Sequence, residues 1–238
     1  MTNKIKPYKK ALEFSYATSA YVVIEMLRYK PDIVINVYVH SNFVDKLGLA
    51  ELCHANNIPI IYSNKAFNLI NQKQNCYVIG VFRKYETTLQ SDKPHIVLVN
   101  PSDMGNIGTI IRTAAGFNIK NIAIITPAVD IFDPKTIRAS MGSIFRINFQ
   151  LYADFPRYVS AYGEHNLFPF MLDGTASLNE CEPCLFSLIF GNEASGLGKT
   201  FAHIGKSVKI PISGEIDSLN LSIAAGIGMY VFSTMNNL

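Results

Sequence analysis

The strongest constraint on the fold of this chain is a regular alternation of strand-like and helical segments in its second half. Short runs rich in Ile, Val, Leu and Phe are separated by stretches whose apolar residues recur at helical spacing. The strand-like runs lie at residues 95–99, 121–125, 167–172, 185–190 and 208–210, and the helical ones at 107–117, 134–141 and 152–162. Such alternation predicts an α/β fold, a parallel β-sheet with helices on its faces.

The last helical stretch, residues 219–232, is apolar on nearly every side. It is too short to cross a lipid bilayer, which takes about 20 residues in a helix. A helix that is apolar all round is normally buried. We therefore expect it inside the domain or in a subunit interface, and we expect no membrane partner.

The first third of the chain has an alternating pattern of its own. Helical spacing at residues 17–29, 44–55 and 65–71 alternates with strand-like runs at 33–39, 58–62 and 76–81. Residues 83–94 are polar and charged, as is typical of a linker. The sequence therefore predicts a small α/β domain over residues 1–82, a linker over 83–94 and a larger domain over 95–238.

Composition favours a globular protein that does not coat nucleic acid by charge alone. Of 238 residues, 49% are apolar and 16% charged, and the net charge is only +3. The first residues are charged and lack the apolar core of a signal peptide, so we expect a cytoplasmic protein. Lysines crowd the first ten residues and form either a solvated end or an arm that contacts phosphates: Lys4, Lys6, Lys9 and Lys10.

The chain has four cysteines, two of which, Cys181 and Cys184, have a C-x-x-C spacing. A zinc site would need a second pair of ligands nearby, and a thioredoxin-like motif would lie at a strand-to-helix turn. Here the pair precedes a strand-like run, so we expect ordinary reduced thiols and no metal.

Three segments of the second half carry the chemical signal. Each joins an apolar run to Gly, Asn or Ser and to one or two charged residues. They are N-P-S-D-M-G-N-I-G-T-I-I-R-T-A at residues 100–114, L-I-F-G-N-E-A-S-G-L at 188–197 and I-P-I-S-G-E-I-D-S-L-N-L-S-I-A-A-G at 210–226.

In this order and spacing, the three segments resemble the signature motifs of the SpoU-type (TrmH-like) RNA 2'-O-ribose methyltransferases of the SPOUT superfamily. The resemblance implies a C-terminal methyltransferase domain with a parallel sheet and a deep trefoil knot. The N-terminal pattern is similar to the L30e-like RNA-binding domain that many of these enzymes carry. It departs from the family at Gln74-Asn75-Cys76-Tyr77, where members often have His-Gln-Gly.

The resemblance further implies S-adenosylmethionine as cofactor and transfer of its methyl group to a ribose 2'-oxygen. Such a transfer needs an in-line methyl group, loss of the hydroxyl proton and a fixed RNA backbone, and orientation alone can supply about 7–11 kcal/mol. Ligands of open α/β sheets bind beyond the carboxyl ends of the strands. The residues expected to hold the cofactor are Leu172, Gly174, Gly191, Ile210 and Leu219.

The residues expected to carry the reaction are Asn106, Arg112, Glu193, Ser218 and Asn220, of which the family pattern assigns Arg112, Ser218 and Asn220 to the site. Because an arginine stays protonated, we expect Arg112 to grip a phosphate and stabilise the developing alkoxide rather than act as a base. Its apolar surroundings in the sequence predict a fixed partner. Asn106 and Ser218 are also N-cap candidates for the helices that follow them. Glu193 would pair with Arg112 or Arg138, or hold a loop amide.

A fourth block, residues 135–146, is similar to an Arg-Ala-Ser-x-Gly segment of the family. Its Lys135, Arg138 and Arg146 either line the RNA path or form a solvated helix face. The expected substrate is ribosomal RNA, with transfer RNA as the alternative. The family also implies a homodimer, whose interface on the last helix would include Ile227, Tyr230 and Val231.

Two readings from other classes compete with a methyltransferase. Residues 193–200 nearly fit the phosphate-binding pattern G-x-x-x-x-G-K-[ST], but Glu193 replaces the first glycine and would set a carboxylate beside phosphates. A nucleotide hydrolase is therefore the weaker interpretation. The other alternative is an RNA-binding protein without activity, against which the complete set of five catalytic candidates argues.

Overall fold

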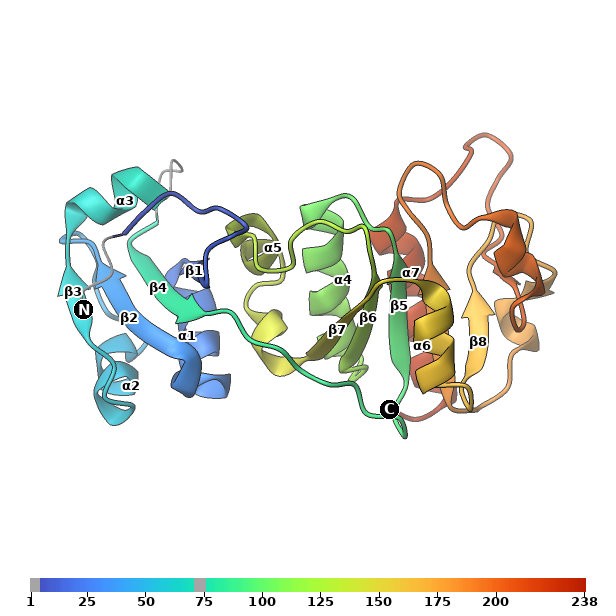
Figure 1. The fold of residues 1–238 in the computed structure, drawn as a ribbon, viewed down its shortest axis with the longest axis horizontal. Helices are drawn as coiled ribbons and strands as arrows, with labels where there is room; N and C mark the ends of the chain where they lie inside the picture. The colour runs from blue at the N-terminus through green and yellow to red at the C-terminus, as the bar shows by residue number, and fades with distance from the viewer. Residues whose placement is uncertain (1–4, 71–75) are drawn as a thin grey trace. The chain divides into compact units, whose positions relative to one another are not determined.

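The computed structural model describes residues 5–70 and 76–238, which form two compact units (Figure 1). The first comprises Met1–Tyr85 and Asp130–Arg146, and the second Glu86–Val129 and Ile147–Leu238. Residues 130–146 thus group with the N-terminal part, although the sequence pattern placed them in the C-terminal domain. Expectations about Lys4 and about residues 74–75 lie outside the described residues.

The first unit is built on a four-stranded sheet with the order β1-β4-β2-β3. Strand β4 is antiparallel to both β1 and β2, and β3 is parallel to β2. The strands are β1 (Phe14–Thr18), β2 (Val34–Val39), β3 (Ile60–Tyr62) and β4 (Val78–Arg83), and the helices are α1 (Ala20–Tyr29), the 3-10 turn η1 (Pro31–Ile33), α2 (Leu49–Ala55) and α3 (Asn64–Ile70).

Strand β1 was not predicted, because its last residues were read as the start of a helix. Tyr16 and Ala17 are fully buried and pair with β4, and the helix begins only at Ala20. The strand has only five residues and ends directly before the helix, so the apolar residues at the junction fit the spacing of a strand as well as that of a helix.

Residues 130–146 complete the core of the first unit. They form α5 (Pro134–Ala139), capped by the side chain of Asp133, and the 3-10 turn η2 (Ser143–Arg146). Helix α5 packs against β1, and the Ser15 hydroxyl donates to the Phe132 carbonyl at 2.5 Å. The rings of Phe145 and Phe82 meet edge to face at 5.2 Å. This segment is therefore part of the unit rather than a free RNA-contacting loop.

The second unit is built on a five-stranded, fully parallel sheet with the order β7-β6-β5-β10-β8, which confirms the predicted α/β fold with a mainly parallel sheet. The strands of this sheet are β5 (His95–Val99), β6 (Asn121–Ile125), β7 (Asn148–Tyr152), β8 (Asn166–Pro169) and β10 (Phe186–Phe190). A separate parallel pair joins β9 (Ala176–Ser177) to β11 (Val208–Lys209).

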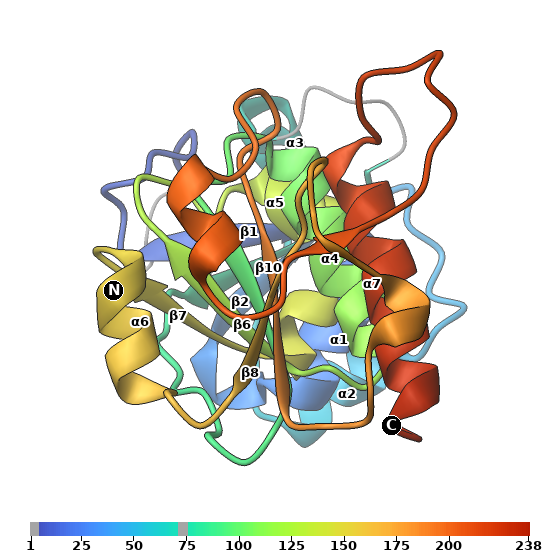
Figure 2. The same ribbon diagram turned by 90° about the vertical axis from the view of Figure 1, so that its right-hand side faces the viewer.

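Helices cover both faces of this sheet (Figure 2). The helical elements are α4 (Met104–Gly116), α6 (Phe155–Ala161), α7 (Leu221–Met235) and the 3-10 turns η3 (Leu178–Glu180) and η4 (Lys199–His203). Along β10, Ile189 packs into the cluster formed with α6, whereas the Phe186 ring contacts Phe232 of α7. Successive β10 side chains thus serve opposite faces, as a strand buried on both sides requires.

Helix α7 is less enclosed than its composition predicts. Ala225, Met229 and Phe232 are buried, but Ile223 and Tyr230 are 54% and 58% exposed. One side of the helix packs on α4 and β10 while another side is open. Within the described part of the chain, no helix is both long and apolar enough to cross a membrane.

A buried polar network lies at the amino-terminal ends of β5 and β10. The Tyr158 hydroxyl is 2.9 Å from Nδ1 of His95 and 2.6 Å from the Ser187 hydroxyl. Ser187 in turn lies 2.8 Å from Nδ1 of His165. The outer ring nitrogens of the two histidines face the carbonyl oxygens of Gln90 and Ser91. Burial lowers the pKa of His95 to about 4.

Candidate active site

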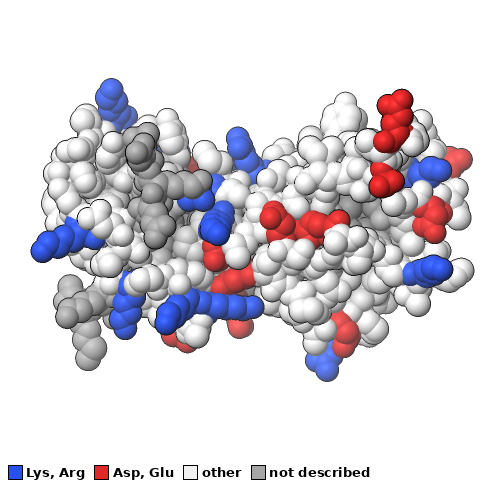
Figure 3. All heavy atoms as spheres, turned by 90° about the horizontal axis from the view of Figure 1, so that it is seen from above, with Lys and Arg blue, Asp and Glu red and all other residues white. Residues whose placement is uncertain are grey.

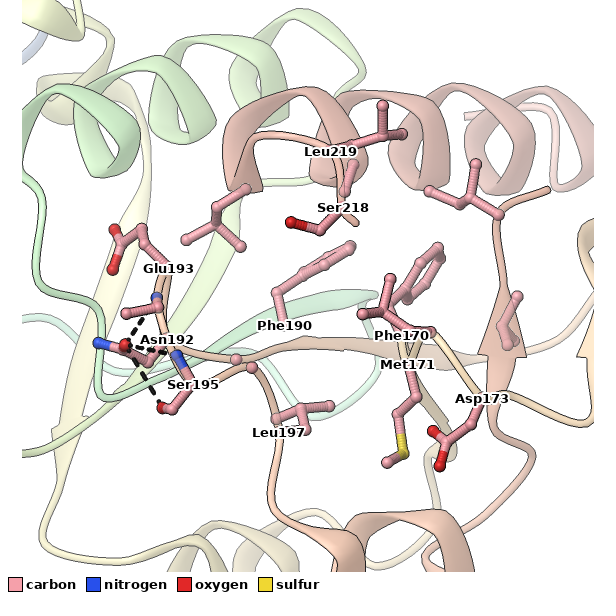
Figure 4. A pocket seen from close by; sticks show the side chains of 18 of the residues that line it. Phe170, Met171, Asp173, Phe190, Asn192, Glu193, Ser195, Leu197, Ser218 and Leu219 are labelled. Atoms are coloured by element: carbon pink, nitrogen blue, oxygen red, sulfur yellow. Dashed lines mark hydrogen bonds between the residues drawn. The ribbon is translucent and has the colours of Figure 1, made fainter. Parts of the chain in front are cut away.

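A cavity of about 510 Å³ opens beyond the carboxyl-terminal ends of β8 and β10 (Figure 4). Open α/β sheets bind their ligands at this edge, and the volume is within the range of small-molecule sites. Four short segments line it: residues 170–173, 190–197, 208–212 and 218–224. Residues 190–197 lie in the second sequence motif, and residues 210–212 and 218–224 lie in the third.

The segment after β10 is a tight turn built around Gly191 and Asn192. Oδ1 of Asn192 accepts from the main-chain N–H groups of Ala194 and Ser195 at 2.9 and 3.2 Å, and its Nδ2 donates to the Asn100 carbonyl. A Cβ on Gly191 would lie 2.2 Å from the main-chain carbon of Gly196. Gly191 lines the cavity as predicted, but the need for glycine comes from this turn closing on itself.

Glu193 joins the first motif to the second. Its carboxylate accepts from the N–H and hydroxyl of Ser102 at 2.9 and 2.6 Å, and from the N–H of Asp103 at 3.0 Å. Burial would raise its pKa, but hydrogen bonds led by those from Ser102 outweigh that and hold the pKa below its usual value. Of the three roles considered for Glu193, holding loop amides is the one observed.

Asn106 continues this connection toward the third motif. Its Nδ2 donates to Glu193 at 3.3 Å, and its Oδ1 accepts from Nδ2 of Asn220 at 3.1 Å. Three of the five catalytic candidates therefore form one hydrogen-bonded chain. The Ser218 side chain lines the cavity, and Figure 4 shows it beside Leu219.

The two N-cap predictions were wrong by a few residues. Helix α4 begins at Met104, and Asp103 caps it by accepting from the N–H of Asn106 at 2.7 Å. Asn220, not Ser218, caps α7 by accepting from the N–H of Ser222 at 2.8 Å. Asn106 and Ser218 consequently keep their side chains available for other contacts.

Arg112 lies on the exposed side of α4. No hydrogen bond, ion pair or ring contact to Arg112 occurs within residues 5–70 and 76–238, so the prediction that Arg112 has a fixed partner was wrong. The neighbouring Ile110, Ile111 and Ala114 are fully buried, which shows that the apolar surroundings reflect the inner side of the helix. The guanidinium is open to an external ligand.

Four of the five predicted cofactor residues line the cavity: Leu172, Gly191, Ile210 and Leu219. Gly174 does not line it. A Cβ there would lie 2.6 Å from the main-chain carbon of Val208, so this glycine lets the turn after β8 lie against β11. The sequence reading missed Phe170, Asp173 and Phe190, although their positions at strand ends were a usable signal.

The three residues expected on the RNA path all lie in the first unit. Lys135 is exposed and Arg138 half-buried. Nε of Arg146 donates to Glu25 at 2.5 Å, and its guanidinium lies 4.4 Å from the centre of the Tyr29 ring. Arg146 thus has partners within its own unit.

A nucleotide-hydrolase site finds no support. Lys199 and Thr200 begin a five-residue 3-10 turn, whereas a phosphate-binding loop leads into the amino terminus of a longer helix. Among the described residues, no three His, Cys, Asp or Glu side chains are grouped as metal ligands. Cys181 and Cys184 form no disulfide, and burial raises the pKa of both thiols.

Comparison with known proteins agrees with this geometry. The SpoU rRNA Methylase family model matches residues 93–230, which include all three motifs and the cavity. This chain belongs to the SpoU family. A crystal structure of an AdoMet-bound rRNA methyltransferase from Sinorhizobium meliloti superimposes with a TM-score of 0.80 at 25% identity, covering 93% of this chain and 87% of that one.

Two curated relatives each match more than half of the chain. A 23S rRNA (uridine(2479)-2'-O)-methyltransferase of Streptomyces viridochromogenes is 30% identical over 145 residues, 57% of this chain and 50% of that protein. A ribosomal RNA small subunit methyltransferase G 2 of Syntrophobacter fumaroxidans is 31% identical over 137 residues, 58% of this chain and 26% of that protein. The match thus spans half or less of these two relatives.

Proposed function

We propose that this SpoU-family protein transfers a methyl group from S-adenosylmethionine to a ribose 2'-hydroxyl of ribosomal RNA. One observation carries the proposal: the second and third motifs line one cavity, and the first motif is hydrogen-bonded to both of them through Asn106, which contacts Glu193 and Asn220. A catalytic constellation held in place before substrate arrives avoids reorganisation during the reaction.

The cavity suits the proposed cofactor. Its middle is walled by apolar side chains, including Phe170, Phe190 and Leu197, which can cover a flat adenine ring. We assign Leu172, Gly191, Ile210 and Leu219 to holding the cofactor, and Gly174 to supporting Leu172. When bound, S-adenosylmethionine supplies an electrophilic methyl group.

The catalytic residues have separate roles in this proposal. Arg112 binds a backbone phosphate of the RNA and stabilises the developing 2'-alkoxide, because its guanidinium has no partner among the described residues. Asn106 and Asn220 orient the ribose, Ser218 contributes a hydroxyl at the cavity wall, and Glu193 fixes the loop that leads into α4. A phosphate oxygen or water accepts the proton.

Ribosomal RNA is the proposed substrate because both relatives named above are rRNA methyltransferases, and we propose a cytoplasmic location on the same ground. On the face drawn in Figure 3, lysines and arginines are scattered in small groups rather than joined in one patch. With a net charge of +3, recognition would therefore rest on a few contacts, among which we keep Lys135, Arg138 and Arg146 as candidates.

Two architectural features belong to the same proposal. We assign residues 1–82 to an L30e-like RNA-binding domain, 83–94 to a linker and 95–238 to a knotted SPOUT domain, of which residues 130–146 group with the first unit. The mixed sheet β1-β4-β2-β3 with its helices supports the first assignment. The parallel sheet, together with a last helix that packs on α4 directly after the third motif, supports the knot.

We also propose a homodimer that uses the open side of α7. Ile223 and Tyr230 lie seven residues apart on this helix and are more than half exposed, and Ile227 lies between them. A self-complementary apolar stripe fits a two-fold interface. Tyr230→Glu would bury a charge there and should give a monomer by sedimentation, whereas a parent protein that is monomeric at micromolar concentration would rule the dimer out.

The proposed activity is tested by incubating the purified protein with methyl-labelled S-adenosylmethionine and unmodified ribosomal RNA, then digesting the RNA to nucleosides. We expect label in a 2'-O-methylnucleoside. Transfer RNA tested in parallel decides between the substrate classes. Label on a base, or no transfer by folded protein that binds RNA, would refute the proposal.

A further inference from the structure

In the described part of the chain, the charged side chains that line the cavity are all acidic. Among the described residues that line it, the only ionisable side chains are Asp173 and Glu193, and none is Lys, Arg or His. The Glu193 carboxylate is occupied by the N–H and hydroxyl donors of the first motif. Asp173 has no hydrogen bond or ion pair with any residue of the described ranges. Asp173 is therefore the carboxylate of the cavity that has no partner among the described residues.

The turn that carries Asp173 is fixed against β11. The N–H of Met171 donates to the Val208 carbonyl at 2.9 Å, and the N–H of Gly174 donates back to Met171 at 3.2 Å. Since no Cβ would fit at Gly174, the turn lies in main-chain contact with β11. Figure 4 shows Asp173 at the opposite end of the cavity from Glu193, with the apolar side chains between them.

We propose that Asp173 makes this cavity selective for the charge of its ligand, so that it binds the sulfonium cofactor more tightly than the neutral thioether product. The inference rests on the proposed function. S-adenosylmethionine carries one positive charge more than S-adenosylhomocysteine, and the two are otherwise alike except for the methyl group. An unpaired carboxylate in the same cavity attracts that charge at any distance within the site, without direct contact.

The consequence for turnover is directional. Methyl transfer removes the charge that Asp173 attracts, so the product is held less tightly than the cofactor that replaces it. Because the carboxylate is exposed, the effect is moderate: we expect a ratio of the two dissociation constants of about threefold to tenfold. Asp173 is thus a specificity-determining residue rather than a catalytic one.

Calorimetry with three ligands tests this inference: S-adenosylmethionine, S-adenosylhomocysteine and sinefungin, in which an amine replaces the sulfonium. The parent protein should bind the two cationic ligands more tightly than the neutral one. In Asp173→Asn this preference should fall to within about twofold of equality, mainly through weaker binding of the cations. Raising the salt from about 50 to about 500 mM should reduce the preference in the parent protein and leave the variant unaffected.

Asp92→Asn is the matched control, because it removes the same charge from an exposed residue outside the cavity of the second unit. It should keep the parent's preference. Equal loss of all three ligands in Asp173→Asn, no loss of any, or no preference in the parent would each overturn the inference while leaving the methyltransferase proposal intact. A folded parent that binds none of the ligands would end both.

Discussion

Two polar networks lie at opposite ends of the same parallel sheet, and they differ in what they leave open. At the amino-terminal ends of the strands, His95, Tyr158, Ser187 and His165 are all at most 5% exposed, and each bonds to another member or to a carbonyl. At the carboxyl-terminal ends, hydrogen bonds run from half-buried Glu193, which lines the cavity, through half-buried Asn106 to exposed Asn220.

This difference distinguishes polar residues that stabilise the fold from polar residues that can bind a ligand. A buried network with all its partners inside the protein rigidifies the core and has no group left for a ligand. The network beside the cavity uses Glu193 to hold the loop before α4, while Arg112 on α4 and Asp173 in the cavity wall have no partner among the described residues. Polar side chains at the two ends should therefore respond to substitution in different ways.

The largest expected effect is at Arg112. Lysine keeps the charge but loses the planar, two-pronged grip on a phosphate. Arg112→Lys should lower turnover by at least ~100-fold, the scale of losing one preorganised donor, and leave the dissociation constant for S-adenosylmethionine near that of the parent. If the variant's turnover in a methyl-transfer assay stays within a few-fold of the parent's, the role of Arg112 in catalysis at the carboxyl-terminal end of the sheet is refuted.

The second largest effect is expected at His95. Substitution there should change the stability of the fold and leave cofactor binding unchanged. Its folded pKa of about 4 lies below the ordinary value of 6.5, so between these values the unfolded chain binds a proton that the folded chain does not. Stability is lost as the pH falls through this window, by about 2 kcal/mol between about pH 7 and about pH 5.

Urea unfolding of the parent and of His95→Gln measures this contribution. The variant should be less stable at neutral pH, and the gap between the two proteins should narrow by about 2 kcal/mol as the medium is acidified to about pH 5. Cofactor affinity of the folded variant at neutral pH should match the parent. A difference in stability that does not change with pH, or a loss of cofactor binding, would contradict the view that the network at the amino-terminal ends of the strands is purely structural.

Glu193→Gln should give the smallest effect and a mixed one. The amide keeps one acceptor oxygen but presents N–H groups toward donors in the first motif, so the loop before α4 loosens. We expect about tenfold slower turnover together with about 1 kcal/mol lower stability. Glu180→Gln, in a capping box away from the cavity, is the control and should change turnover by less than twofold. A stability change without a turnover change would make Glu193 a structural residue only.

The sequence predicted the centre of the fold better than its margins. Strands β5 and β6 have the predicted bounds, because continuous runs of Ile, Val and Leu mark strands buried on both faces. The edge strand β7 was not predicted, since its half-exposed N-F-Q-L-Y pattern has no continuous apolar run, and its last residue, Tyr152, began a predicted helix. Packing of residues 130–146 into the first unit depends on contacts distant in sequence, such as Ser15 to Phe132, which no local pattern encodes.

The sequence predicted which residues belong to the site but not the hydrogen bonds between them. Motif order identified Asn106, Glu193 and Asn220, and the structure supplies the hydrogen bonds that join them. The expected partner of Arg112 was wrong because a helical sequence does not show which side of the helix faces the core. Asp173 was not predicted, because the charge balance of a cavity depends on which segments, distant in sequence, form its walls.

The central claim is that the second unit methylates a ribose of ribosomal RNA. Mapping 2'-O-methyl groups in ribosomal RNA from cells with and without this protein tests it most directly. We predict that one ribose mark is absent without the protein and returns with the parent chain but not with Arg112→Lys. Ribosomal RNA in which every 2'-O-methyl group persists, or a missing mark on a base, would contradict the account.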